Sequence, residues 1–343
     1  MQLLSSSSLR RASGRRVAIC GRLIDARAPL LSVSFARSFS SPSKDLTPYQ
    51  KLQKWIQPFV TGFKGLYHEN KQAWALRRRL QESKGQLLLT RREMILLRQA
   101  PRDLLKSLPL LVFFGVPLVG YAAPLLGYQF PKQLLPRQFW RPDQKTQFMR
   151  EEVEARATTY PELIQLLLQI QHKDDTLQEL LALAKSETSG GLRPTQVAEL
   201  MPFFQGPASL QQLSSQHIHV LSKGTARFPT FAVLNKLLMQ SQLEKRLARK
   251  TMEISVDDQQ LLKEGVDDLT LDELEFACHE RGIVTQYGEI ATLRYALKEW
   301  LTMYDTDRFD PASDMQSLPP SLLLHAPALA SFTKPEENGG KTV

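Results

Sequence analysis

The amino-acid sequence predicts an all-α protein in which one transmembrane helix is followed by a soluble helical bundle. Apolar residues recur with helical spacing throughout residues 145–305, in segments such as "PELIQLLLQIQ" and "TLDELEFACHERG" that Gly or Pro separates. No segment sustains the alternation of apolar and polar residues that indicates a β-strand. The third observation is an uncharged stretch at residues 107–131, "SLPLLVFFGVPLVGYAAPLLGYQFP". Together these patterns favour helices packed around one core, with an apolar segment ahead of it.

The apolar stretch has the length of a bilayer crossing. Leu108 to Gly127 are 20 residues, which as a helix would measure about 30 Å and match a hydrocarbon core. Membrane helices tolerate prolines better than soluble ones, so we predict a transmembrane helix over 107–131 that is kinked at Pro117. A buried hairpin or an in-plane wedge is the alternative. Five Lys or Arg residues flank the stretch within 20 residues on each side, so charge does not predict its orientation.

The first 43 residues have the composition of a mitochondrial presequence. They contain seven arginines, eleven serines and one acid, Asp25, and no continuous apolar core. These charges account for +6 of the formal net charge of +9, which leaves the rest of the chain only mildly basic. We expect processing after Phe39, and the alternative is a disordered basic tail. The whole segment 1–43 is expected to be disordered.

The remaining segments are predicted from their helical patterns. Residues 44–106 read as juxtamembrane amphipathic helices, one around Trp74 and one that starts at the capping-box pair Thr90 and Glu93. Residues 132–305 are predicted to form the helical domain. Residues 306–343 are rich in Pro, Ser and Gly and are expected to be a disordered tail, apart from the apolar "LLLHAPALA", which could dock elsewhere.

Two long blocks of the sequence resemble a known family. Residues 89–139 are similar to the membrane segment of the leucine-zipper/EF-hand transmembrane (LETM) proteins of the mitochondrial inner membrane. Residues 238–301 are similar to the core of the ribosome-binding-like domain of that family, notably at Glu264-Gly265-Val266, Arg281-Gly282 and Lys298-Glu299-Trp300-Leu301. The segment "DTDRFDPASDMQ" lacks the glycine and the final glutamate of a calcium loop, so the chain looks like the short LETM domain-containing member without EF-hands and coiled coils.

The resemblance implies two activities with different requirements. One is a matrix domain that meets the mitochondrial ribosome or another matrix complex and supports membrane-protein biogenesis, respiratory function and mitochondrial structure. The alternative is cation/proton exchange (K⁺/H⁺ or Ca²⁺/H⁺), or its regulation, which needs an ionisable group at membrane depth. Exchanger-type members of the family carry an acid after the central proline, where this sequence has Gly120. We therefore favour a ribosome tether that is inserted in the inner membrane with its domain in the matrix. An outer-membrane location is the alternative.

A basic cluster is the candidate partner-binding site. Lys245 and Arg249, and likewise Arg246 and Lys250, are four residues apart in one predicted helix, so each pair shares a side of it. Such a face could contact rRNA phosphates or an acidic ribosomal protein, and a merely solvated face is the alternative. Residues 264–280 hold seven acids and no Lys or Arg, so we expect a protein partner there. A lipid bilayer and a homo-oligomer are further expected partners, and no small-molecule substrate is evident.

The motifs of enzymes and metal sites are not present in the sequence. It contains no phosphate loop, no G-x-S-x-G and no H-E-x-x-H. His217 and His219 lie about 200° apart on a helix and cannot share one metal, so we expect one at the surface and one half-buried. Cys278 occupies an apolar helix position that suits a small core residue. We expect a protein that is not an enzyme and that uses no catalytic residue, metal or cofactor.

Overall fold

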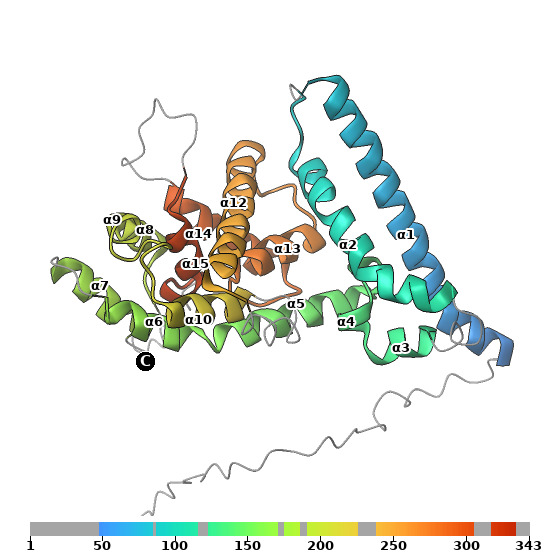
Figure 1. The fold of residues 1–343 in the computed structure, drawn as a ribbon, viewed down its shortest axis with the longest axis horizontal. Helices are drawn as coiled ribbons and strands as arrows, with labels where there is room; N and C mark the ends of the chain where they lie inside the picture. The colour runs from blue at the N-terminus through green and yellow to red at the C-terminus, as the bar shows by residue number, and fades with distance from the viewer. Residues whose placement is uncertain are drawn as a thin grey trace, which may run out of the picture. The chain divides into compact units, whose positions relative to one another are not determined.

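The computed structural model is helical throughout the residues that it describes, which are 48–84, 87–115, 123–170, 175–185, 191–225, 238–304 and 317–333. This confirms the all-α prediction (Figure 1). The helices are α1 (Pro48–Glu82), α2 (Arg91–Gly115), α3 (Ala123–Gln129), α4 (Pro131–Leu134), η2 (Arg137–Phe139), α5 (Pro142–Ala157), α6 (Tyr160–Leu168), α7 (Asp175–Lys185), α8 (Pro194–Glu199), α9 (Met201–Gln205), α10 (Ser215–Thr225), α12 (Gln240–Glu264), α13 (Leu271–Arg281), α14 (Ile290–Leu301), η4 (Thr302–Tyr304) and α15 (Pro320–Leu329). The predicted presequence, 1–43, lies outside the described residues.

The core of the domain is built around α15. Trp300 of α14 is completely buried and lies in the larger apolar cluster with Leu322 and Leu323 of α15. The next residue, Leu324, joins a second cluster formed mainly by α6, α10 and α12. Because one short helix takes part in both clusters, it links the two halves of the core. α15 packs against α6, α9 and α12 (Figure 1).

This helix contains the one apolar part of the tail. Residues 306–343 were expected to be disordered apart from "LLLHAPALA", which could dock elsewhere, and Pro320–Leu329 form α15 and are almost entirely buried. The apolar "LLLHAPALA" therefore docks in the middle of the domain. A parallel β-bridge between Leu192 and Ala330 fixes the end of the helix, since the Leu192 N–H donates to the Leu329 carbonyl at 2.9 Å and the Ser331 N–H donates to Leu192 at 3.0 Å. Composition did not specify where the segment docks, because its burial depends on contacts with helices distant in the sequence.

Residues 107–131, the predicted transmembrane helix, are described only in part, since 116–122 lie outside the described residues. In the described residues α2 ends at Gly115 and α3 begins at Ala123, and α3 packs beside α2. Leu110 is buried with Leu135, which lies beyond the predicted span, and with Phe59 of α1. Among the described residues, no helix has both the length and the apolarity that a bilayer crossing requires. The single transmembrane helix is therefore not confirmed, and Pro117 lies outside the described residues.

Local signals explain where α2 and α13 begin and end. At the start of α2, Glu93 accepts a hydrogen bond from the Thr90 N–H at 3.0 Å, as the capping-box spacing predicted. At the start of α13, Thr270 and Glu273 form the same arrangement, with a 2.9 Å bond from the Thr270 N–H. α13 then stops at Gly282, whose φ of 79° lies in the left-handed region that glycine adopts most easily.

Candidate functional site: a basic cavity between α2 and α12

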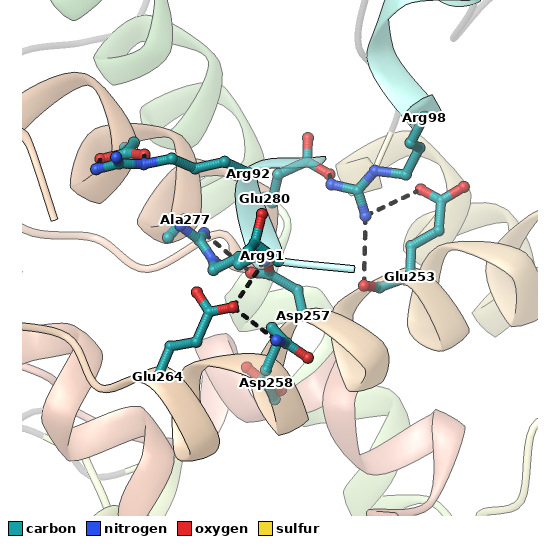
Figure 2. Close-up of polar contacts among 12 residues, drawn as sticks. Arg91, Arg92, Arg98, Glu253, Asp257, Asp258, Glu264, Ala277 and Glu280 are labelled. Carbon is teal, nitrogen blue, oxygen red and sulfur yellow. Dashed lines mark hydrogen bonds and ion pairs between the residues drawn. The ribbon is translucent and has the colours of Figure 1, made fainter. Parts of the chain in front are cut away.

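The basic residues of α2 bind α12 and α13. Arg91 is only 1% exposed, and its side chain donates to Asp257 of α12 at 2.8 Å (Figure 2). Its backbone N–H, which has no partner within the first turn of the helix, donates to Glu264 at 2.9 Å. Asp257 also accepts from Arg281 of α13 at 2.8 Å. One buried carboxylate thus joins three helices.

A second buried carboxylate completes this charge cluster. Asp258 accepts hydrogen bonds from Arg281 Nε at 2.9 Å, Trp300 Nε1 at 3.1 Å and the Tyr304 hydroxyl at 2.7 Å. Burial alone would raise the pKa of Asp257, but Arg281 and Arg91 outweigh it and hold that pKa below its usual range. In turn the two aspartates raise the pKa of Arg281 against the effect of its burial. Two arginines and two aspartates therefore form a balanced buried cluster that holds the domain together.

More exposed ion pairs continue along α2. Arg92 pairs with Glu273 at 3.1 Å, and Arg102 pairs with Glu253 at 3.1 Å. Arg98 also approaches Glu253 (Figure 2). Glu280 pairs with Lys250 and with Arg98. The acidic segment 264–280, which we expected to face a protein partner, is thus largely engaged by basic residues of the same chain. The sequence showed the charges of both surfaces but not that they meet, since the partners of Arg92 and Arg102 are more than 150 residues away in the sequence.

A cavity of about 580 Å³ lies beside this interface. It is partly open and is lined by residues of α2, α4, η2, α5, α10, α12 and α13. Its lining contains six Lys or Arg residues and three acids, a formal charge of +3 with His279 neutral: Arg102, Lys106, Arg137, Arg246, Arg249 and Lys250 against Asp103, Glu152 and Glu253. Apolar side chains, among them Leu105, Trp140 and Leu247, complete the walls. The cavity therefore combines a net positive charge with apolar surface.

Aromatic rings hold two of these cations. Lys106 Nζ lies 4.8 Å from the centre of the Trp140 ring, and the Arg137 guanidinium lies 4.3 Å from the centre of Phe276. These are favourable cation–π distances, and they restrict the side chains at the inner wall. His279, which also lines the cavity, is 2.9 Å from Glu152. Burial alone would raise the pKa of Glu152, but His279, Lys132 and Lys106 bring it below its usual range, so the lining includes an anionic side chain.

The structure divides the predicted basic cluster of α12. Lys245, Arg246 and Arg249 are exposed, as a contact surface requires. Lys250 is half-buried and pairs with Glu280. Arg246, Arg249 and Lys250 line the cavity, whereas Lys245 does not. The sequence alone did not reveal Lys106 and Arg137 as members of this site, because they belong to α2 and η2 and only the folded chain brings them to α12.

The other residues singled out from the sequence have structural roles or lie outside the described part. His217 is 2% exposed and His219 is half-buried, so the expectation that one of them lies at the surface is wrong. Cys278 is completely buried, as its apolar position predicted. Within the described residues no group of three or more His, Cys, Asp or Glu side chains could hold a metal ion. Gly120 lies outside the described residues.

The described residues form a helical domain that buried ion pairs attach to α2, and the C-terminal part of α2 is apolar. Residues 89–329 match the family model described as "LETM1-like, RBD". The chain belongs to the LETM1-like family, as the sequence resemblance indicated.

Named relatives agree with this assignment. LETM1 domain-containing protein 1 of Xenopus tropicalis is 30% identical over 283 residues, which cover 80% of this chain and 75% of the relative. Its human counterpart is 31% identical over 245 residues, 70% of this chain and 64% of the relative. The mitochondrial proton/calcium exchanger protein of Drosophila melanogaster is 29% identical over 243 residues, 69% of this chain but only 22% of the relative. No solved structure matches the chain.

Proposed function

We propose that this protein is a mitochondrial inner-membrane protein whose helical domain holds a matrix complex, the mitochondrial ribosome, close to the bilayer. It is not an enzyme in this proposal; it acts by binding and so supports membrane-protein biogenesis and respiratory function. The observation that carries the proposal is the fixed attachment of the domain to α2. Arg91 at the start of this helix is locked into the core, while its C-terminal part belongs to the uncharged stretch 107–131.

The apolar end of α2 supports attachment to a membrane. Leu105, Leu108 and Val112 recur at helical spacing and are 69%, 50% and 59% exposed. On the neighbouring α3, Leu125 and Tyr128 are 58% and 59% exposed. An apolar surface of this kind is typical of contact with lipid or with another protein. We propose that residues 107–131 insert into the inner membrane, as one kinked helix or as the hairpin that the pairing of α2 and α3 favours, and that the domain faces the matrix.

Membrane attachment is tested by alkaline carbonate extraction of mitochondria, with protease protection in mitoplasts. We expect the protein to stay in the membrane pellet and the domain to be cleaved only after the inner membrane is opened. Release into the supernatant would contradict insertion. The same samples test the presequence, since the mature protein is expected to begin near Phe39, and an intact Met1 would contradict cleavage.

The exposed cations of α12 are the proposed ribosome contact. Lys245 and Arg249 are exposed and lie on one side of the helix, where phosphates or an acidic ribosomal protein can reach them. We expect the double variant Lys245→Glu/Arg249→Glu to weaken salt-sensitive co-sedimentation with mitochondrial ribosomes. The matched control is Arg78→Glu/Arg150→Glu, which reverses two exposed cations, 82% and 56% exposed, on other helices. Equal co-sedimentation of both variants at low salt would exclude this face.

Cation/proton exchange is the second candidate, because one relative carries the name of a proton/calcium exchanger. The described acid nearest to the apolar stretch is Asp103, which is 7% exposed and accepts a hydrogen bond from Gln138 at 2.9 Å. A buried acid that already accepts a hydrogen bond is a weak candidate for binding a transported ion. Proton-coupled K⁺ or Ca²⁺ flux by the purified protein in liposomes would favour exchange over the tether.

A further inference from the structure

We infer that the cavity between α2 and α12 binds the headgroup of an anionic phospholipid, with Lys106 and Arg137 on its phosphate and the acyl chains along the apolar face of α2. This inference deepens the membrane attachment proposed above and rests on it. It assigns to the domain a specific lipid ligand rather than a general affinity for the bilayer. Charge, pre-organisation, position along α2 and size each support it.

The charge of the cavity selects an anion. Six cationic and three acidic side chains line it, and Glu280 pairs with one of the cations, Lys250, so the site keeps a net positive charge that a phosphate diester complements. Lys and Arg near a membrane surface each contribute roughly a fivefold gain in affinity for anionic lipid. A zwitterionic headgroup would add an ammonium to a site that is already cationic. The site should therefore discriminate between phosphatidylglycerol and phosphatidylcholine.

The two inner cations are pre-organised for this task. Lys106 lies over Trp140 and Arg137 over Phe276, so the rings restrict their side chains before any ligand arrives. The N–H groups of a guanidinium lie in its plane, which is the geometry that phosphate oxygens accept, and a ring against its face does not obstruct this plane. Both residues are half-buried, so a contact with them is less screened than one with the exposed Lys245.

The position of the cavity along α2 supplies the apolar half of the ligand. Lys106 is the last charged residue before the uncharged stretch 107–131. Leu105 and Pro109, which flank it, line the cavity, and the exposed Leu108 and Val112 extend the same helix beyond it. A headgroup in the cavity would therefore have its acyl chains beside the segment proposed to enter the bilayer. This is the order of polar and apolar groups within a phospholipid.

The size of the cavity argues against a free phosphate ion. A volume of about 580 Å³ lies within the range of about 300–1,000 Å³ typical of small-molecule pockets and is far larger than one anion needs. The apolar walls formed by Trp140, Met149 and Leu243 would also have no apolar group to contact on such an ion. A headgroup with its glycerol and the first methylenes of its chains fits both the volume and the lining.

The test is calorimetric titration of the full chain in maltoside micelles with four compounds. These are dihexanoyl phosphatidylglycerol, dihexanoyl phosphatidylcholine, glycerol 3-phosphate and inorganic phosphate. We expect saturable binding of the phosphatidylglycerol alone. The variants Lys106→Gln and Arg137→Gln should each weaken it roughly fivefold, and the double variant about 25-fold. Lys106→Arg should retain binding, and Lys245→Gln, which removes a cation outside the cavity, should leave it unchanged.

Several outcomes would overturn the inference. Equal binding of phosphatidylcholine would show that charge is not read, and equal binding of glycerol 3-phosphate or inorganic phosphate would indicate a site for soluble phosphates. Unchanged affinity in a folded Lys106→Gln/Arg137→Gln variant, checked by its thermal melt, would exclude the cavity. Because the ligand is presented as a soluble short-chain lipid, failure here is separate from failure of carbonate resistance or of ribosome co-sedimentation, which test the proposed function.

Discussion

Replacing Arg91 by methionine should release α2 from the domain, whereas the same change at its neighbour Arg92 should not. Both arginines pair with a carboxylate of the helical domain through two nitrogens. The side chains of the Arg91–Asp257 pair are 1% and 8% exposed, whereas Arg92 is 66% exposed. Adjacent positions in one helix thus offer a matched comparison in which burial is the main variable.

The expected magnitude follows from that burial. Removing one partner of a buried pair costs about 3–5 kcal/mol, because the remaining charge is left uncompensated. Asp257 retains Arg281, so we take the lower end, about 3 kcal/mol, which corresponds to a roughly 100-fold rise in the opening equilibrium of α2. Arg92→Met should leave that equilibrium close to the wild-type value, since water replaces an exposed partner.

Hydrogen exchange measures this directly, because local opening exposes the amides of α2 without requiring global unfolding. Protection should fall roughly 100-fold along α2 in Arg91→Met and stay near wild type in Arg92→Met. α14 serves as the internal reference, since its residues Leu293, Ala296 and Leu297 are completely buried in the apolar core. Equal protection of α2 in the two variants would refute the argument that the buried cluster fixes this helix.

Three further predictions concern the core. His217 and His325 are 2.8 Å apart through their Nε2 atoms, and burial lowers their pKa values from 6.5 to about 4 and about 3. Both must be neutral in the folded state, so stability should be fully present above about pH 6.5. The free energy of unfolding should fall as the pH drops through that value toward 4, by up to about 1.4 kcal/mol per pH unit for each histidine. Urea titrations at several pH values should show a smaller dependence of this free energy on pH in a His217→Gln/His325→Gln variant than in the wild type. Burial raises the pKa of Cys278 to about 12, so iodoacetamide should modify it only in urea, and rapid labelling of the folded protein, followed at that peptide by mass spectrometry, would contradict its place in the core. Gly282→Ala should cost at least about 1–2 kcal/mol in the free energy of unfolding, measured by urea titration, since its φ is 79° and a Cβ there would overlap a buried guanidinium. No change in stability would contradict this close approach.

The sequence predicted what is local and missed what is distant. The capping box at Thr90 was predicted from its spacing, and the helix over "TLDELEFACHERG" was predicted to end at its glycine, because both features depend on neighbours within four residues. The clamp between Arg91 and Asp257 joins residues 166 positions apart. Composition can list such charges but cannot pair them, and for that reason the acidic segment 264–280 was interpreted as a partner surface.

The candidate site was predicted only in part, for the same reason. Helical spacing placed Lys245 and Arg249 on one side of α12, and both are exposed. Lys106 and Arg137 come from segments about 110 to 140 residues earlier and meet α12 only through packing. Their contacts with Trp140 and Phe276 depend on ring positions that periodicity does not specify.

The central place of α15 determines when the domain can finish folding. Chains emerge from ribosomes and translocases from the N-terminus onward, and domains generally fold as they appear. Here α6, α10, α12 and α14 all precede the helix whose leucines join the two apolar clusters. Until Leu329 has been synthesised, the groove between these helices is unfilled and its apolar side chains are exposed. Chaperones are then needed to prevent aggregation through these side chains. A ribosome that stalls after α14 would therefore leave a chain that contains α12 and its basic residues but lacks the helix that completes the core.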